Sequence, residues 1–244
     1  MIRRLRGSEM PGPSNEFSYG GTDNLEAMRE ATSYNRFLTD SVELFSGESQ
    51  SWLDFGAGIG TFAEMLRDRG RSVDCLEPDP SLAGMLNNKG FRTFGSSEGI
   101  ASETYDYVYS LNVFEHIEQH LSAAREACRI LRPGGRLFIY VPAFQFLFGA
   151  MDRKVGHYRR YTKSSLSSLV RESGFTVQKV GYADSLGVVA TLLFNLVSTS
   201  EGSIGRRSVT AYDSYVFPLS RLIDRMACSV IGKNVFVVAR KVDE

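Results

Sequence analysis

Residues 51–60 read SWLDFGAGIG, an apolar run that reaches an acid at Asp54 and then passes through three alternate glycines. The pattern predicts a buried strand that turns sharply into a helix, because glycine adopts backbone conformations that other residues avoid. Helical spacing of apolar residues resumes over the following TFAEMLRDRG. The start of a helix presents unpaired backbone N–H groups and the positive end of its dipole. We therefore expect a small polar ligand at this turn.

The spacing of the glycines distinguishes two kinds of nucleotide site. A dinucleotide fingerprint, G-x-G-x-x-G, would need a glycine at Thr61, whereas this chain has its third glycine one residue earlier. The stretch instead resembles motif I of the class I S-adenosylmethionine-dependent methyltransferases, an acid followed by x-G-x-G-x-G. The resemblance implies that S-adenosyl-L-methionine binds here, at Asp54, Gly56, Ala57, Gly58 and Gly60. A glycine-rich turn that binds nothing is the alternative.

A second acid stands where the ribose of a nucleoside would lie. Glu77 follows Gly56 by 21 residues and ends the apolar stretch SVDCLE. An acid at the tip of the second strand of such a fold bonds both ribose hydroxyls. Pro78 stops this strand and is assigned to the cofactor site, and Asp79 is expected to cap the next helix. A solvated acid at a strand end is the alternative for Glu77.

Two further segments complete the expected cofactor site. Methyltransferases that resemble this chain often carry an acid after the third strand that bonds the adenine amine; here Ser96 and Ser97 stand in that region. The stretch YDYVYSLNVFEHIEQ resembles motif IV of the family, which implies that Asn112 and Glu115 face the sulfonium. His116 is interpreted chiefly as a histidine packed at the start of a helix. RPGG followed by RLFIYVP resembles the signature that follows these motifs in the family.

The order of the expected elements indicates an α/β domain over residues 24–244. Alternating strands and helices predict a doubly wound, mostly parallel seven-stranded sheet of Rossmann-like methyltransferase type, with ligands at the strand carboxyl ends. The apolar stretch 234–241 resembles the antiparallel seventh strand of the family. Residues 185–232 form a helical insertion before it, which we interpret as a lid, a homodimer contact or a membrane-surface patch. Residues 1–23, rich in Gly, Pro and Ser, are expected to be a mobile leader.

Composition restricts the classes of function. The 244 residues carry 28 basic and 28 acidic side chains, so the net charge gives no reason to expect a nucleic-acid partner. The longest apolar run is too short for the roughly 20 residues of a membrane-spanning helix. The three cysteines are far apart and show no metal-ligand spacing. We therefore expect a cytoplasmic protein with no transmembrane segment and no resident metal.

The acceptor is expected beside the stretch PAFQFLFGAMDRKVGHYRRYTKSSL, which follows the fifth strand. Its phenylalanines offer an apolar surface, and its basic cluster suits a phosphate or carboxylate. G-H-x-R-R-Y-T also resembles a group of bacterial methyltransferases, often linked to surface glycan or lipid metabolism, whose acceptors are mostly undefined. We expect a small-molecule or lipid- or glycan-linked anionic acceptor. Its predicted contacts are Tyr34, Arg153, Tyr158, Arg159 and Arg160.

The alternatives on the acceptor side are structural. Residues 24–45 predict two helices before the first strand, and Tyr34 on the second of them is either a lid residue over the cofactor or an aromatic packed at the sheet edge. The basic stretch is either an anion site or a solvated loop whose tyrosines pack on the sheet.

His157 is the predicted general base. Methyl transfer from a sulfonium is an in-line displacement, in which the enzyme mainly aligns donor and acceptor and excludes water. A hydroxyl acceptor also loses a proton, and surrounding cations would favour the neutral histidine that accepts it, so O-methylation is predicted. A carboxylate or thiolate acceptor would need no base, and His157 would then only bind. Two other functions stay open, a non-catalytic S-adenosylmethionine-binding regulatory module and a nucleotide-cofactor oxidoreductase.

Overall fold

The computed structural model describes residues 26, 28–197, 206–226 and 230–242. The expected mobile leader, residues 1–23, lies outside them. The strands are β1 Trp52–Phe55, β2 Val73–Leu76, β3 Thr93–Phe94, β4 Tyr105–Leu111, β5 Leu131–Pro142, β6 Phe175–Ala183 and β7 Asn234–Lys241. They form one sheet in the order β3-β2-β1-β4-β5-β7-β6, in which β1 to β5 are parallel and β7 is antiparallel to both of its neighbours. The predicted doubly wound sheet with an antiparallel seventh strand is confirmed.

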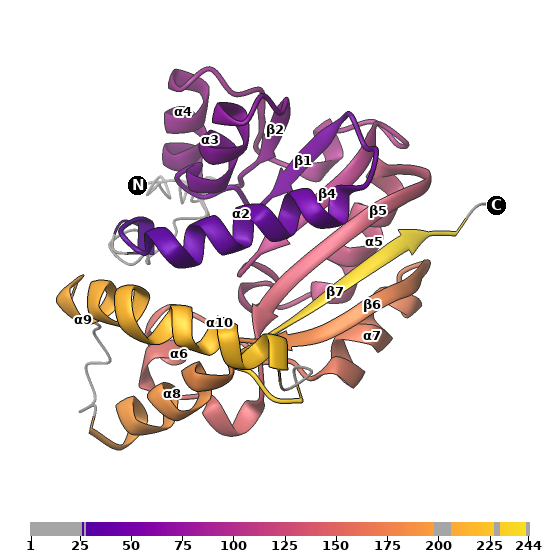
Figure 1. The fold of residues 1–244 in the computed structure, drawn as a ribbon. Coiled ribbons are helices and arrows are strands. Elements are labelled where there is room, and N and C mark those ends of the chain that lie inside the picture. Colours follow the sequence, from indigo (N-terminus) through magenta and orange to yellow (C-terminus); the bar gives the residue numbers. More distant parts are fainter. Residues whose placement is uncertain (1–25, 27, 198–205, 227–229, 243–244) are drawn as a thin grey trace, which may run out of the picture.

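Helices cover both faces of the sheet (Figure 1). Those described are α2 Thr32–Ser46, α3 Thr61–Asp68, α4 Pro80–Asn88, α5 His120–Ile130, α6 Ala150–Lys154, α7 Lys163–Glu172, α8 Ser185–Val197, α9 Arg206–Ala211 and α10 Phe217–Met226. Buried side chains of α5 and α7 pack on one face, and those of α2 and α3 pack on the other. None of the helices within the described ranges has the length and hydropathy needed to cross a membrane.

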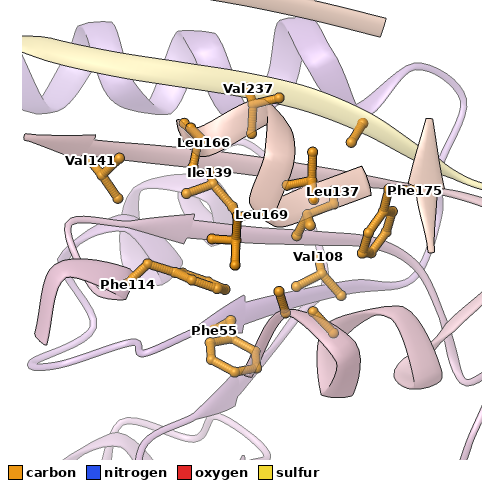
Figure 2. Close-up of a cluster of buried hydrophobic side chains, with 14 of the residues drawn as sticks. Phe55, Val108, Phe114, Leu137, Ile139, Val141, Leu166, Leu169, Phe175 and Val237 are labelled. Atoms are coloured by element: carbon orange, nitrogen blue, oxygen red, sulfur yellow. The ribbon is translucent and has the colours of Figure 1, made fainter. Parts of the chain in front are cut away.

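The core lies on both sides of β5. Leu137, Ile139 and Val141 belong to the cluster under α5 and α7, part of which Figure 2 shows, whereas Phe138 and Tyr140 belong to the cluster under α2 and α3. All five side chains are fully buried. A strand turns successive side chains to opposite faces, so a strand covered by helices on both faces is apolar throughout. Because both faces of β5 are covered, residues 137–141 form a continuous apolar run in the sequence.

Local structure agrees with the sequence at several element boundaries. Asp79 caps α4 as predicted, since its Oδ1 accepts from the backbone N–H groups of Ser81 and Leu82 at 2.8 and 3.1 Å. Helical residues at positions 26, 28 and 29 precede a turn and then α2, in line with two helices over 24–45. RPGG lies within the bounds of β5 at an irregularity of the ladder. Between paired positions, β4 advances from Tyr105 to Tyr107 while β5 advances from Leu131 to Arg136, and the extra residues turn at Gly134, whose φ is 71°.

Segment 185–232 contains the helices α8, α9 and α10 (Figure 1), and two buried acids in it, Asp213 and Asp224, accept from backbone N–H groups outside it. Asp213, in a π-helical segment between α9 and α10, accepts from the backbone N–H groups of Ser33 and Tyr34, both at 2.8 Å. It therefore caps α2 from the far end of the chain. Asp224 of α10 likewise accepts from the backbone N–H groups of Asp184 and Ser185, at the start of α8. Helix α9 begins at residue 206, and residues 198–205 before it lie outside the described residues.

Candidate active site

The glycine turn after β1 borders a cavity of about 560 Å³ at the carboxyl ends of the parallel strands. Three glycines of the turn, Gly56, Gly58 and Gly60, have positive φ angles of 86°, 55° and 84°. A Cβ on Gly56 would lie 2.6 Å from both γ-methyl groups of Val113. The sequence predicted a close approach of ligand to backbone here. The structure shows in addition that the tip of β4 packs against this glycine.

The cavity brings together nine of the eleven predicted cofactor residues. Its lining includes Asp54, Gly56, Ala57, Gly58, Glu77, Pro78, Ser96, Ser97 and Asn112. Gly60 lies outside the lining, because it starts α3 and faces Leu86 of α4. Glu115 also lies outside it and is fully buried. The parts of the chain that carry the methyltransferase-like motifs therefore converge on one hollow.

Glu77 is held in place by the backbone. Its Oε2 accepts from the N–H of Gly58 at 2.7 Å, and its Oε1 accepts from the N–H of Asp79 at 3.0 Å. Burial raises the pKa of this carboxyl, and the two N–H groups oppose the shift. Each carboxylate oxygen can accept a further hydrogen bond, so the group can still bind a pair of hydroxyls at the cavity rim.

Asp54 carries an acceptor without a partner. It is 2% exposed, and its Oδ2 makes no well-formed hydrogen bond with a described residue, although the hydroxyl of Tyr109 lies near enough to lower the pKa of the carboxyl in part. Burial raises the pKa of this carboxyl to about 7, and the charge of Glu77 adds to the effect. A buried acceptor is costly unless something donates to it. A ligand bearing N–H or O–H donors in the cavity would satisfy this oxygen.

The residues predicted to contact the acceptor do not all line the cavity. Tyr158 lines the cavity, whereas Tyr34 does not. The ring of Tyr34 packs edge-on against Tyr140 and Phe217, and its hydroxyl accepts from the amide of Asn112 at 3.5 Å. Tyr34 thus makes the aromatic packing that was the alternative interpretation, and it also contacts a cavity residue.

The predicted arginines lie outside the cavity lining and differ in what they bind. Arg160 pairs with Asp152 in a forked geometry, Nε to Oδ1 at 2.8 Å and Nη2 to Oδ2 at 2.9 Å, and both side chains are buried. Arg159 donates to the backbone carbonyls of Ile117 and Glu118 at 2.6 and 3.0 Å. Arg153 is exposed. The forked carboxylate contact of Arg160 is therefore made within the protein.

His157 lies in a cluster that the sequence did not reveal. Its Nδ1 is 2.7 Å from Oδ1 of Asp152, and its Nε2 is 3.9 Å from Oε1 of Glu115. The ring of His116 stands edge-on at a centroid distance of 4.5 Å. The prediction that cations surround His157 is wrong, because Asp152 and Glu115 are closer to its nitrogens. His116, predicted mainly as a packing residue, is the histidine that lines the cavity.

Burial acts in opposite directions on the two inner members of this cluster. Burial raises the pKa of Glu115 to about 8, and it lowers the pKa of His116 to about 4, helped by the proximity of His157. For Asp152, burial opposes ionisation, but hydrogen bonds from His157 and Arg160 hold the pKa of its carboxyl well below its usual range. Sequence reasoning missed Asp152, whose one available signal was its position five residues before His157.

Comparison with known proteins supports the motifs. Residues 28–180 match a family described as a methyltransferase domain. The chain is 32% identical over 129 residues to an uncharacterized methyltransferase of Mycolicibacterium vanbaalenii, a match covering 49% of this chain and 51% of that protein. With an uncharacterized methyltransferase of Mycolicibacterium paratuberculosis it shares 28% over 160 residues, 60% of this chain and 63% of the relative. The chain thus spans between about half and five eighths of these curated relatives.

Solved structures share the fold at low sequence identity. Phosphoethanolamine N-methyltransferase 2 of Haemonchus contortus, in complex with S-adenosyl-L-methionine, aligns with a TM-score of 0.62 and 15% identity over 96% of this chain and 62% of that one. Geranyl diphosphate C-methyltransferase of Streptomyces coelicolor, in complex with Mg²⁺, geranyl diphosphate and S-adenosyl-L-homocysteine, aligns with a TM-score of 0.60 and 11% identity over 85% and 77%. At such identities the likeness concerns the fold.

Proposed function

Because this chain belongs to the methyltransferase domain family, we propose that it transfers the methyl group of S-adenosyl-L-methionine to an oxygen of an anionic acceptor. One observation carries the proposal. The carboxylate of Glu77 is fixed by the backbone of the glycine turn at the rim of an open cavity. Ligand cavities of several hundred Å³ are typical of small-molecule sites, and this one has room for a nucleoside.

The residues of the cavity suit each part of the donor. Glu77 can accept from both ribose hydroxyls, and the unpartnered Oδ2 of Asp54 can accept from a donor group of the amino-acid end. The backbone beside Ser96 and Ser97 borders the adenine side. When bound, S-adenosylmethionine would supply an electrophilic methyl group. The protein would align the reactants and exclude water, which is where most of the rate of such a displacement arises.

An anionic acceptor is supported by where the basic stretch is anchored. The backbone N–H of Tyr158 donates to the carbonyl of Glu115 at 2.8 Å, which holds this stretch against the tip of β4. Arg153 and Arg159 therefore lie on a segment that borders the cavity. Tyr158 and Phe146 are 54% and 60% exposed and offer an apolar contact to the rest of the acceptor. We propose a small-molecule or lipid- or glycan-linked acid, with Arg160 left out of the anion site because Asp152 occupies its guanidinium.

The base in this proposal is His157. Asp152 engages its Nδ1, which leaves Nε2 to take a proton from a hydroxyl acceptor. His116 lines the cavity and stands against the ring of His157, so the acceptor hydroxyl would have to approach beside it. Replacing His157 with Gln should then lower kcat for a hydroxyl acceptor while leaving donor affinity unchanged.

Calorimetry with S-adenosylhomocysteine tests the donor site. Glu77→Ala removes an ionised acceptor, and hydrogen bonds to charged groups contribute about 1.5–3 kcal/mol. We expect affinity to fall by at least about tenfold, while the exposed Glu48→Ala, away from the cavity lining, binds like the wild type. Unchanged affinity of the Glu77 variant would remove the ribose assignment.

Turnover separates the proposal from its alternatives. Formation of S-adenosylhomocysteine from the donor should be measured with pooled acidic metabolites, lipids and glycan-linked acids as acceptors. Donor binding without turnover in any pool would favour a regulatory module. Quenching or enhancement of NADH fluorescence on titration, without binding of S-adenosylhomocysteine, would favour a nucleotide-cofactor oxidoreductase.

A further inference from the structure

We infer that Glu115, His116 and His157 form a binding site for a divalent transition-metal ion beside the cavity, which His116 lines. Each residue offers one donor atom, and the three donor atoms all lie within 4.8 Å of one another. Ligands about 2.1 Å from a tetrahedral ion are about 3.4 Å apart, so small side-chain rotations would close the three on one ion. Two imidazole nitrogens and one carboxylate oxygen suit Zn²⁺, Mn²⁺, Fe²⁺ or Co²⁺.

Glu115 is the strongest single reason for a cation. The residue is fully buried, and apart from the contact with its own backbone N–H, neither of its carboxylate oxygens has a hydrogen-bond partner among the described residues. A buried carboxylate without hydrogen bonds is rare in folded proteins, because the water it gave up is not replaced. Nε2 of His157 lies 3.9 Å from Oε1 of Glu115. An ion between these atoms would supply the missing ligand to both.

The surroundings of His157 are those of a metal-binding histidine. Such a residue usually engages a carboxylate or a carbonyl through its second nitrogen, which fixes the ring and selects the tautomer. Asp152 does this at Nδ1, at 2.7 Å, and leaves Nε2 directed to Glu115. Asp152 is itself fixed, by the forked contact with Arg160 and by the backbone N–H of Gly149 at 2.8 Å. Asp152 of α6 thus holds the imidazole of His157, and Arg160 in turn holds the carboxylate of Asp152.

His116 connects the cluster to the cavity. It lines the cavity, and its ring also interacts with the backbone at Val155 and Gly156, which fixes its orientation. Three protein ligands leave at least one coordination position open, and in catalytic sites that position takes water or substrate. Resting on the proposed function, we assign this position to an acceptor oxygen. The ion would hold the anion that Arg160 cannot bind. With the ion bound, Nε2 of His157 would be a metal ligand and not the general base, and the ion would instead promote loss of the hydroxyl proton.

Titration of the full chain with Co²⁺ tests the site without donor or acceptor. After treatment with EDTA and desalting, the wild type should bind one equivalent and develop visible ligand-field bands, which Zn²⁺ then abolishes by competition. Glu115→Gln and His157→Ala should weaken binding at least tenfold. The chain has three histidines, and the third, His120, contacts the hydroxyl of Tyr161 instead, so His120→Ala is the matched control and should bind like the wild type.

A second measurement needs no variant. In histidine-labelled wild-type protein, Zn²⁺ should shift the ring resonances of His116 and His157 and leave those of His120 in place. No saturable Co²⁺ binding, or equal loss in the His120 variant, or equal shifts of all three rings, would overturn the site. The outcome is separate from that for the proposed function, because S-adenosylhomocysteine binding to the metal-free protein is measured independently. Donor binding without metal binding would reject this inference alone.

Discussion

On one side of the cavity, Glu77 is held by backbone N–H groups of Gly58 and Asp79, whereas on the other side Asp152 is held mainly by the side chains of Arg160 and His157. The first arrangement follows from the path of the main chain through a glycine turn. The second depends on which charged side chains meet after folding. The proposed donor side is therefore a property of a local motif, and the proposed acceptor side is a property of pairing between side chains.

Replacing Arg160 with Ala gives the largest expected effect on the acceptor side. It leaves the carboxylate of Asp152 buried without its forked partner, which should cost about 3–5 kcal/mol of unfolding free energy. Arg153→Ala removes an exposed arginine from the same stretch and should change stability by less than about 0.5 kcal/mol. Urea unfolding measures both. A stable Arg160 variant with a raised KM for the acceptor would restore this arginine to the anion site.

Asp54→Asn probes the buried charge on the donor side. Burial raises the pKa of Asp54 to about 7, so the folded protein keeps a proton that the unfolded chain releases near pH 4. The unfolding free energy of the wild type should therefore fall as pH rises from about 4 to about 7. At about 1.4 kcal/mol per pH unit, the variant should gain about 3 kcal/mol relative to the wild type between pH 5 and pH 8. A difference between the two proteins that does not change with pH would contradict the shift.

Gly56→Ala tests the main-chain motif by comparison with Gly70→Ala. The two glycines have similar φ angles, 86° and 82°, so alanine is strained by the left-handed backbone conformation at both positions. A Cβ at Gly56 also collides with Val113, whereas a Cβ at Gly70 meets nothing within 4 Å. We expect Gly56→Ala to lose about 2 kcal/mol more unfolding free energy than Gly70→Ala. Equal losses would mean that only the backbone dihedral requires glycine at the turn.

Asp213→Ala and Asp79→Ala compare a distant helix cap with a local one. Each removes a carboxylate that accepts from two backbone N–H groups, and each should cost about 1 kcal/mol by thermal unfolding. Hydrogen exchange separates them further. The Asp213 variant should expose amides at the start of α2 and also those of the π-helical segment Tyr212–Val216 and of α10, which continues it, because Asp213 joins that segment to α2. Faster exchange at α2 alone would show that the insertion is held by other contacts.

The sequence predicted features that depend on neighbouring residues. The bounds of β7, the cap at Asp79 and the glycine turn all follow from local propensity and spacing. Contacts between distant residues were not predicted. Asp213 caps a helix that starts about 180 residues earlier, and His116 meets His157 across 41 positions. A charged side chain carries no local signal of its partner, so the basic stretch suggested an anion site where the fold in part supplies its own carboxylate.

The position of β7 has a consequence for how the nascent chain acquires its sheet. In the finished sheet β6 pairs with β7, and β7 also covers the edge of β5. On the ribosome, residues 131–183 therefore emerge long before residues 234–241 can pair with them. Until then the edges of two strands stay open, and open edges invite association with other chains. The sheet can be completed only after residues 185–232 have been translated. While they are being translated, a chaperone could be needed to protect the open edges.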